Sequence, residues 1–490
     1  MSLVVPFEEI FADTTRLLAK HESWERVELG EICTVLNGFP FKSVLFNREK
    51  GFPIVRIRDL SKGTTETLFD GEVPPEVLIG NGDLLIGMDG IFRCYEWRGG
   101  KAGLNQRACK LIPNELYINR KFLLFGINGY LRAIEEATSS VTVGHLSSRD
   151  ILRIPFPLPP LAEQRRIVAK LVTLLGKVDA CQKRLGKIPI LLKRFRQSVL
   201  AAACSGRLTV DWRELHPQED WPSVTVEEVA PDISYGYTAR ASEDTSGVKF
   251  LRITDIQDGR VDWGTVPFCH VRASRFSHYS LRARDIVFAR TGATTGKSFL
   301  IKACPEAVFA SYLIRVRAGE RVAPEFLYVF FQSDHYWRQI SENIAGSAQP
   351  NCNATKLASL SLTLPSAEEQ QEIVRRVEAL FTIADQIETR YAKAQAHVDH
   401  LTPSLLARTF RGNLVPTEAE LARAEGRDYE PASVLLERIR ASRSETRQPS
   451  RRKPSRATRA APKGGTDQSR RRAPHDEHRR TSRTRSKSGN

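Results

Sequence analysis

The sequence predicts an α+β chain: two mixed α/β domains joined by two long antiparallel coiled-coil helices, arranged as a tandem repeat with a pseudo-twofold axis. Two observations support this prediction. A unit of about 200 residues occurs twice, and each copy ends in a long segment with a heptad seam. With 490 residues, 41% of them hydrophobic, the chain can bury more than one core.

The repeat is visible in several pairs of matching segments. LPPLAEQRRIV at 158–168 recurs as LPSAEEQQEIV at 364–374, and SGRL at 205–208 recurs as RGNL at 411–414, both with an offset of 206. Further upstream, IVRIRDL (54–60) matches FLRITDI (250–256), and DLLIGMDG (83–90) matches DIVFARTG (285–292). Each unit begins at a tryptophan, Trp24 in the first and Trp221 in the second. Two diverged copies are too few for a solenoid.

These matches divide the chain into successive segments. The expected division is an N-terminal extension (1–23), a first front domain (24–157), a first helix (158–206), a linker (207–220), a second front domain (221–363), a second helix (364–412), a C-terminal segment (413–440) and a basic disordered tail (441–490). The fronts are broken by Gly and Pro. Their short β-branched runs predict strands, with helices at 119–136 and 324–343.

A heptad seam runs along each long helix. The first includes Leu171, Leu174, Val178, Leu185 and Leu192, and the second includes Val377, Leu380, Ile387, Val398 and Leu405. Two matching seams in one chain predict that the helices pair with each other. Pro189 and Pro403 should each kink a helix or end a segment. The second front begins only about fifteen residues after the first helix, so the pairing must be antiparallel.

The basic charge is concentrated at the C-terminus. Residues 441–490 hold 16 Lys and Arg against 4 Asp and Glu, a net charge of +12 of the total +16. Such an Arg/Ser/Pro-rich stretch predicts disorder, with sequence-independent affinity for phosphate as the functional alternative to a solvated tail. Eight cysteines without CxxC spacing predict reduced thiols in the cytoplasm. We expect no membrane span and no secretion signal.

Linear motifs of catalysis are absent from the sequence. RTGATTGKS at 290–298 resembles a phosphate loop, but Gly292 and Gly296 are separated by three residues where a Walker A loop has four. There is no Glu-x-Lys nuclease triplet, no Asp/Asn-Pro-Pro-Tyr/Phe, no HExxH and no GxSxG. His145 and His270 are read as isolated histidines, so no metal site is expected.

The duplicated motifs resemble one protein family. PLPPLAEQRRIV and LPSAEEQQEIV, each followed by a heptad helix that ends in SGRL or RGNL, resemble the specificity subunit of type I restriction-modification enzymes. LGEICTVLNGFPFKSVLF (29–46), PIVRIRDL (53–60) and DIVFARTGATTGK (285–297) resemble the target recognition domains of that family. The resemblance covers about residues 24–415 and leaves out residues 1–23 and the basic tail.

The resemblance implies a subunit without catalysis of its own. Each target recognition domain would read one half of a bipartite, asymmetric site in double-stranded DNA. The helices would set the spacer and dock two methyltransferase subunits that methylate adenine N6. It implies no cofactor bound by this chain. S-adenosylmethionine, ATP and Mg would act through the methyltransferase partners and through restriction or translocase subunits.

Basic residues at strand ends and glycine turns are the candidates for DNA contact. They are Arg56, Arg58 and Arg93 in the first domain, and Arg252, Arg290, Thr291 and Lys297 in the second. Arginine can read guanine through a bidentate pair of hydrogen bonds. An ordinary surface or ion-paired role remains the alternative for each of them.

Two other classes of function remain open at this point. A basic scaffold protein would bind DNA through its tail without regard to sequence. An enzyme without a linear motif would show turnover as a purified chain. Neither of these classes requires two matched helices at matched positions.

Overall fold

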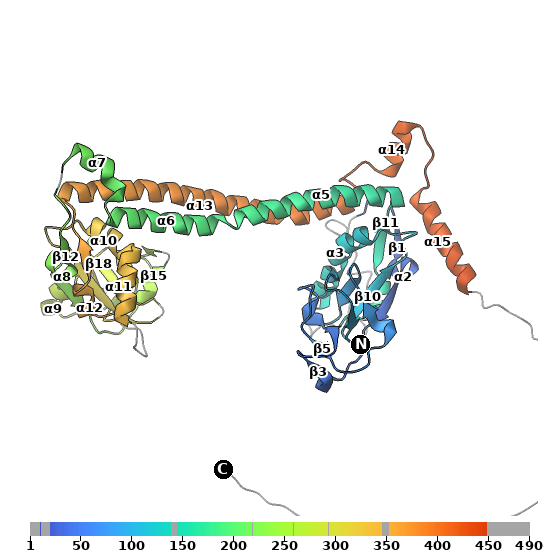
Figure 1. The fold of residues 1–490 in the computed structure, drawn as a ribbon, viewed down its shortest axis with the longest axis horizontal. Coiled ribbons are helices and arrows are strands. Elements are labelled where there is room, and N and C mark those ends of the chain that lie inside the picture. Colours follow the sequence, from blue (N-terminus) through green and yellow to red (C-terminus); the bar gives the residue numbers. More distant parts are fainter. Residues whose placement is uncertain are drawn as a thin grey trace, which may run out of the picture.

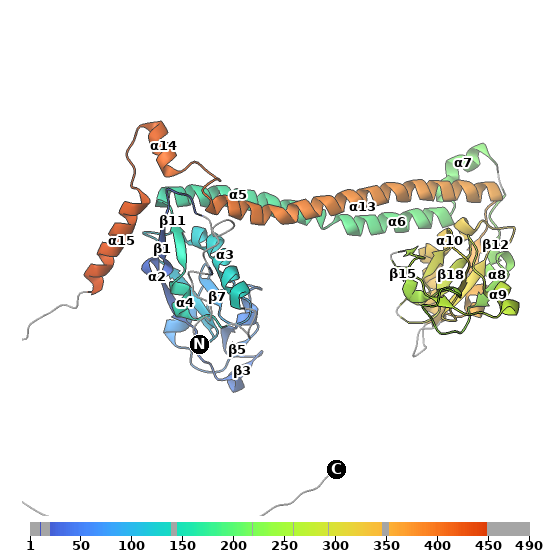
Figure 2. The same cartoon turned by 180° about the vertical axis from the view of Figure 1, so that it is seen from behind.

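A rod of two long helices carries one globular domain at each end. The computed structural model describes residue 10 and residues 20–138, 145–217, 219–257, 259–292, 294–344 and 352–447. Both domains hang from the same side of the rod (Figure 1), and the view from behind shows the same arrangement (Figure 2). The predicted α+β tandem architecture is confirmed.

The first domain is closed by its own first and last strands. β1 (Glu25–Glu28) pairs antiparallel with β11 (Pro155–Leu158), so both ends of the domain lie together at the rod. Its two other sheets have the strand orders β2-β10-β7-β8 and β3-β5-β4-β9-β6. Their strands are β2 (Cys33–Asn37), β3 (Phe46–Asn47), β4 (Phe52–Val55), β5 (Leu68–Phe69), β6 (Leu78–Ile79), β7 (Leu84–Gly87), β8 (Cys94–Glu96), β9 (Ala102–Leu104) and β10 (Ala108–Pro113).

The second domain repeats this plan. β12 (Ser223–Thr225) pairs with β22 (Ser361–Thr363), and a four-stranded sheet has the order β13-β21-β18-β19. β14 pairs parallel with β20, as β4 does with β9. The remaining strands are β13 (Asp232–Tyr235), β14 (Val248–Leu251), β15 (Ile256–Gln257), β16 (Arg260–Val261), β17 (Phe268–Cys269), β18 (Ile286–Ala289), β19 (Ser298–Leu300), β20 (Ala307–Phe309) and β21 (Leu313–Arg317).

The helices of the two domains differ at two places: the second domain has α9 (Ala273–Tyr279), where the first has only a 3-10 turn at Pro75–Val77, and the helix against the rod is divided in two. The first domain has a single helix against the rod, α3 (Arg120–Thr138), where the second has α10 (Pro324–Gln332) and α11 (Asp334–Ile344), separated by the extended residue Ser333. The other short helices are α2 (Leu29–Ile32), α4 (Ser148–Leu152), α8 (Val226–Val229) and α12 (Ala354–Ala358). No helix in the described ranges has the length and apolar character that crossing a membrane requires.

The rod consists of α5 (Leu161–Leu185) and α6 (Ile188–Cys204) on one side and α13 (Ala367–Phe410) on the other. α13 packs along both partners, and Arg196 of α6 forms ion pairs with Asp385 and Glu388 of α13, at 2.7 and 2.8 Å. The predicted antiparallel pairing is therefore confirmed. α5 ends just before Pro189, which stands in the first turn of α6, where its missing N–H leaves no helical bond unmade. Pro403, by contrast, lies inside a helix that continues past it.

The seam residues are buried toward the ends of the rod, and some of them are more exposed in its middle. Leu171, Val178, Val377 and Ala384 are buried, as the heptad pattern predicts. Ile387, a predicted seam residue, is 41% exposed, so its assignment as a core position is wrong. Two helices alone cannot enclose a side chain from all sides, and no domain covers this central stretch.

Both ends of the rod enter the cores of the domains. Ile167 of α5 and Phe410 of α13 belong to the core of the first domain, and Val199 of α6 and Ile373 of α13 belong to that of the second. Each domain is thus packed against the start of one rod helix and the end of the other. This packing fixes the orientation of both domains relative to the rod.

After each long helix the chain turns back at a left-handed glycine, Gly206 (φ 73°) or Gly412 (φ 77°). The first turn leads through a 3-10 turn, η4 (Arg207–Thr209), into α7 (Val210–Leu215), and the second leads into α14 (Glu418–Glu425) and α15 (Ala432–Arg447). Leu435 and Ile439 of α15 are buried in the first domain.

α15 corrects the expected start of the disordered tail. The helix continues through residue 441 to Arg447, and Ser442 lies 3.1 Å from the Tyr117 hydroxyl. The composition of 441–490 hides this helix because its buried face is supplied by the preceding residues. Residues 448–490 and most of the N-terminal extension lie outside the described residues. All eight cysteines carry free thiols, five of them buried.

Candidate nucleic-acid interface

A buried Glu-Gln pair at the start of each rod helix holds the domain in place. Glu163 and Gln164 of α5 and Glu369 and Gln370 of α13 are all at most 1% exposed. The indole Nε1 of Trp24 donates to Glu163 Oε1 at 2.9 Å, and that of Trp221 donates to Glu369 Oε2 at 2.8 Å. The tryptophan that opens each repeat is therefore bonded to the motif that begins the rod helix after its domain.

The two glutamines have the same hydrogen bonds in both units. Gln164 accepts from the N–H of Asn119 at 2.7 Å and donates to the carbonyls of Tyr117 and Pro159 at 3.1 and 2.9 Å. Gln370 accepts from the Ala323 N–H and donates to the carbonyls of Arg321 and Pro365, at 2.7, 3.1 and 2.9 Å. Each buried amide thus has three partners in a setting where an unpaired one would be strongly destabilising.

The two glutamates also bind the segment that follows the opposite helix. Glu163 Oε2 accepts from the Glu418 N–H at 2.9 Å, and Glu369 Oε1 accepts from the Thr209 hydroxyl at 2.6 Å. Burial raises the pKa of Glu163, and the hydrogen bonds from Glu418 and Trp24 oppose this rise by stabilising the charged form. Each domain is therefore tied to both helices.

Each domain builds one surface from the same backbone hydrogen bonds. In the first, the bonds are Phe39 N to Leu104 O, Asn105 N to Val55 O, Gln106 N to Phe39 O, Met88 N to Arg107 O and Leu146 N to Met88 O, all between 2.8 and 3.0 Å. In the second, they are Tyr237 N to Phe309 O, Ala310 N to Leu251 O, Ser311 N to Tyr237 O, Arg290 N to Tyr312 O and Cys352 N to Arg290 O, between 2.7 and 3.0 Å. Several of these residues are buried, and we call the turns that the bonds hold, with the exposed and half-buried side chains that they carry, the first and second turn surface.

The side chains on the two turn surfaces differ. Arg107 of the first has Tyr312 as its counterpart, and Asp89, next to Met88, has Thr291, next to Arg290. Tyr312 is 65% exposed, and the Arg107 side chain is 67% exposed. One backbone scaffold thus presents two chemically different surfaces.

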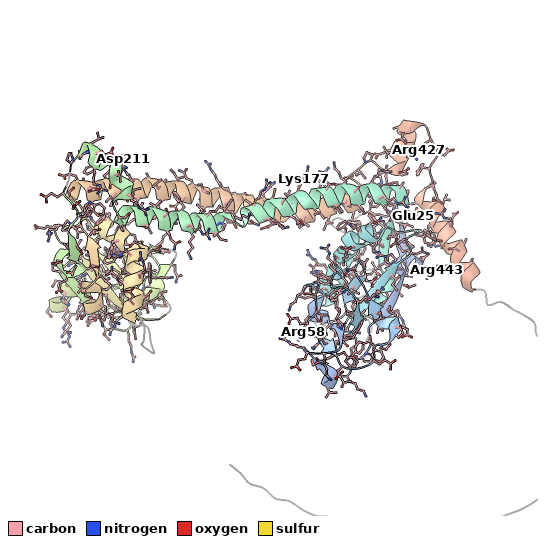
Figure 3. All side chains as sticks on the ribbon, viewed as in Figure 1. Glu25, Arg58, Lys177, Asp211, Arg427 and Arg443 are labelled. Atoms are coloured by element: carbon pink, nitrogen blue, oxygen red, sulfur yellow. The ribbon has the colours of Figure 1, made fainter. Side chains whose placement is uncertain are left out.

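Arg56 and Arg252 adjoin the turn surfaces, one residue after Val55 and Leu251. The Arg56 guanidinium lies 5.4 Å from the centre of the Phe46 ring. Arg252 instead forms two hydrogen bonds to the Asp255 carboxylate, at 3.1 and 2.7 Å. The Arg58 side chain is 60% exposed, on the side of the first domain that faces the second (Figure 3).

The other predicted DNA-binding residues have varied surroundings. Lys297 is exposed, Thr291 is half-buried, and the Arg290 guanidinium stacks 4.8 Å from the centre of the Tyr235 ring. Arg93 is bonded to Glu135 at 2.7 Å and lines a cavity between α3 and α13. Its side chain therefore lies at the junction of the first domain with the rod.

The glycine-rich segment 290–298 is a hairpin connection. It joins β18 to its antiparallel neighbour β19, whereas a phosphate loop leads into a helix. Gly292 and Gly296 both have left-handed backbone, φ 87° and 83°, which suits a tight turn. Among the residues that the structure describes, no group of three His, Cys, Asp or Glu side chains could hold a metal ion.

Sequence reasoning missed several residues of the turn surfaces. Arg107 and Tyr312 lie in no repeated motif, and Asp89 lies in the repeated segment 83–90 without any feature that marks it as a contact; long-range backbone pairing places them on the turn surfaces. His145, taken as isolated, has a partner: its Nδ1 lies 2.6 Å from Asp89 Oδ1. Aligning residues 104–107 with 309–312 in the two repeats would have flagged Arg107.

Comparison with known proteins decides the family. The model of the type I restriction modification DNA specificity domain matches the chain twice, over residues 21–189 and 218–395. The chain belongs to this family. It is 37% identical over 455 residues to the type I restriction enzyme EcoBI specificity subunit of Escherichia coli, covering 87% of this chain and 94% of that protein.

Other specificity subunits give the same result. The EcoKI specificity subunit of Escherichia coli strain K12 is 29% identical over 86% of this chain and 96% of its own length. Among solved structures, the HsdS subunit from Thermoanaerobacter tengcongensis matches with a TM-score of 0.50 and 20% identity, covering 80% of this chain and 97% of that one. A chain from a study of assembly and conformational transition of the type I R-M system matches with a TM-score of 0.61 and 20% identity, over 80% of this chain and 99% of that chain.

The specificity subunit is the component of a type I restriction-modification enzyme that recognises DNA and does not catalyse. The two matches to the family model correspond to the two structural repeats, each containing one domain and most of one rod segment. The two turn surfaces are thus equivalent places in two copies of a DNA specificity domain.

Proposed function

We propose that each domain of this specificity subunit reads one half of a bipartite, asymmetric sequence in double-stranded DNA. The observation that carries the proposal is the pair of turn surfaces, which share five backbone hydrogen bonds but expose different side chains. Sequence is read by side chains that reach base edges, while a fixed backbone holds them in position. Two surfaces of equal geometry and different chemistry suit two different half-sites.

The rod sets the distance between the half-sites. α13 has 44 residues and is therefore roughly 66 Å long, at about 1.5 Å per residue. Both domains hang from the same side of the rod (Figure 1), so one DNA duplex can meet both. DNA repeats every ~34 Å, so domains held apart by the rod can enter major grooves about one turn or more apart.

Arg56, Arg58, Arg252, Arg290, Thr291 and Lys297 are proposed DNA contacts beside or on the turn surfaces. Phosphate contacts position a protein on DNA, and a few base contacts specify the sequence. Arg93 is left out of this set because its side chain lines the cavity between α3 and α13, at the junction of the first domain with the rod. The double-stranded DNA lies in the cytoplasm, where we expect the subunit to act.

The rod also docks two methyltransferase subunits. The seam residues named from the sequence hold the two helices together, since Leu171, Val178, Leu192, Val377 and Val398 are at most 9% exposed. The docking surface is formed instead by apolar residues that the rod leaves open in its middle. These residues are Ile190, Leu191, Ile383 and Ile387, exposed by 57, 59, 50 and 41%. Large exposed apolar groups of this kind mark protein interfaces.

The chemistry comes from the partners. The methyltransferase subunits supply S-adenosylmethionine and transfer its methyl group to adenine N6, and a restriction subunit adds translocation and cleavage driven by ATP and Mg. The specificity subunit contributes the position of the complex on DNA.

Methylation of a randomised DNA library tests the proposal. The purified chain alone should methylate nothing, and together with its methyltransferase it should methylate one bipartite sequence. Methylation by the chain alone would contradict the proposal. Methylation without a sequence pattern would contradict it too, and would favour a basic scaffold that binds DNA through its tail.

A variant pair tests the docking surface. Ile190→Asp with Leu191→Asp should abolish co-purification with the methyltransferase and leave DNA binding intact, because a charge replaces apolar contact area. Lys193→Asp, at a nearby exposed position of α6, is the matched control. An intact complex in the double variant would show that the partner docks elsewhere.

A further inference from the structure

One arginine on the first turn surface has an unusual backbone. Arg107 stands in the turn between β9 and β10 with φ 73°, a left-handed conformation that side chains with a Cβ rarely adopt. Its carbonyl accepts from the Met88 N–H at 2.9 Å, which holds the turn in place. A glycine would adopt this backbone conformation without strain. The arginine therefore stands at a position where the backbone favours glycine.

Among the described residues, a second non-glycine residue with a left-handed backbone offers a comparison. Arg284 has φ 74°, but both ends of its guanidinium bind the Glu325 carboxylate, at 2.8 and 2.7 Å. Two of the three guanidinium nitrogens of Arg284 are thus engaged within the fold. The Arg107 guanidinium makes one ion pair among the described residues, from Nε to Asp89 Oδ2 at 3.4 Å.

The position of Asp89 explains how Arg107 is oriented. One carboxylate oxygen faces Arg107 Nε, and the other lies 2.6 Å from His145 Nδ1. His145 is itself fixed by a β-bridge to Asp89. The carboxylate is therefore held between two basic groups, and it engages Arg107 through Nε. The two terminal nitrogens, Nη1 and Nη2, remain for a ligand.

We propose that Arg107 is a base-reading residue of the first domain and recognises guanine through Nη1 and Nη2. This inference rests on the proposed function. Two parallel N–H donors match the O6 and N7 acceptors of guanine in the major groove, the commonest specific contact between a side chain and a base. Asp89 positions the guanidinium of Arg107, and His145 positions the carboxylate of Asp89.

The second domain cannot make this contact at the equivalent place. Its turn carries Tyr312 where the first domain carries Arg107, and Thr291 where the first carries Asp89. Neither side chain has a planar pair of donors. The guanine preference at this point of the scaffold therefore belongs to the first half-site alone, which contributes to the asymmetry of the whole site.

The test uses the full-length chain with its methyltransferase and a randomised DNA library. Arg107→Gly removes the guanidinium and at the same time suits the left-handed backbone, so the thermal stability should stay equal or rise. Preference for guanine at one position of the first half-site should fall by about 5- to 150-fold, the range for losing one bidentate contact. The second half-site and the spacer should not change.

Three further variants separate base reading from general charge. Arg107→Lys keeps the positive charge but loses the planar pair of N–H donors, so this variant should also lose the guanine preference. Arg107→Tyr introduces the residue of the second domain and should also lose it. Arg98→Ala removes another exposed arginine of the same domain, 79% exposed and paired with Glu96, and should leave the sequence preference unchanged.

The outcomes distinguish a failure of the Arg107 proposal from a failure of the proposed function. If the wild-type chain gives a bipartite pattern and Arg107→Gly leaves it unaltered, Arg107 is an ordinary surface arginine and the inference is overturned. A change at the second half-site, or a first half-site without guanine on either strand, overturns it as well. If the wild-type chain gives no bipartite pattern, it is the proposed function that fails.

Discussion

The junction between the first domain and the rod depends on one large side chain entering a gap left by a glycine. Phe410, the last residue of α13, is 3% exposed, and its ring centre lies 5.2 Å from that of Phe122. A Cβ atom on Gly126 of α3 would come within 2.5 Å of Phe410 Cζ. The phenylalanine and the glycine are therefore complementary in volume.

The second junction has the opposite arrangement. Ala323 corresponds to Asn119 through the glutamine anchors, so Phe330 corresponds to Gly126. Cys204 precedes Gly206 by two residues, as Phe410 precedes Gly412. Phe330 is 2% exposed in the core of the second domain, and Cys204 packs against that core. The large residue comes from the rod at one junction and from the domain at the other.

This exchange predicts a compensating pair of substitutions. Phe410→Cys should destabilise the first domain by about 3–5 kcal/mol, as for a large side chain lost from a core. Gly126→Phe alone should cost about 1–3 kcal/mol or more through overpacking. The double variant reproduces the second junction and should recover much of the loss, with a coupling energy of roughly 1–3 kcal/mol.

Calorimetry of the full-length chain measures this. A loss of about 3–5 kcal/mol corresponds to a fall in Tm of roughly 6–20 °C for the domain concerned, at ~2–4 °C per kcal/mol. Leu116→Ala, at a position that is 72% exposed, is the control and should change stability by no more than about 0.5 kcal/mol. A double variant as unstable as the sum of the two single variants would refute the argument.

Three more predictions follow from the rod and the tail. Inserting four residues after Arg196 and four after Asp385, which face each other across the rod, lengthens it by ~6 Å. This should widen the gap between the two half-sites by about two base pairs, read by methylome sequencing, and an unchanged gap in an active variant would show that the helices do not set it. Hydrogen bonds from Arg375 and Arg376 lower the pKa of Glu372 to about 2, below its value in the unfolded chain. The charged carboxylate therefore stabilises the fold relative to the Glu372→Gln variant. This difference in the free energy of unfolding should be complete above about pH 4.5 and should shrink as the pH falls toward 2. Urea unfolding between pH 7 and 3 measures this, and a difference that grows on acidification would be the wrong sign. Removing residues 448–490, which hold 14 Lys and Arg against 3 Asp and Glu, should weaken DNA binding chiefly at low salt and leave the methylated sequence unchanged, whereas a new sequence would refute the expectation.

The large-scale architecture could be predicted because it follows from patterns in nearby residues of the sequence. The repeated LPPLAEQ and LPSAEEQ motifs, the heptad spacing and the short link between Gly206 and Trp221 are enough to predict two domains on an antiparallel rod. Pro189 could be predicted to interrupt its helix. Pro403 could not be told apart from it, because whether a helix continues past a proline depends on the packing around it.

The details of the candidate site depend on contacts between distant residues. Arg107, Asp89 and His145 meet because β10 pairs with β7 and the segment before α4 forms a bridge to Asp89, and no linear pattern joins them. Arg93 looked like a DNA contact because of its glycine turn, but Glu135 from α3 binds it. α15 was hidden because its apolar residues are few and become meaningful only against the core of the first domain.

An exchange of domains tests the central claim most directly. Residues 221–363 would be replaced by the corresponding domain of another specificity subunit, with the rod and the first domain kept intact. Methylome sequencing of cells that carry this chimaera and its methyltransferase would then give the new site. If each domain reads its own half-site, one half of the methylated sequence changes while the other half and the spacer remain. A change in both halves would contradict the claim that each domain reads its own half-site.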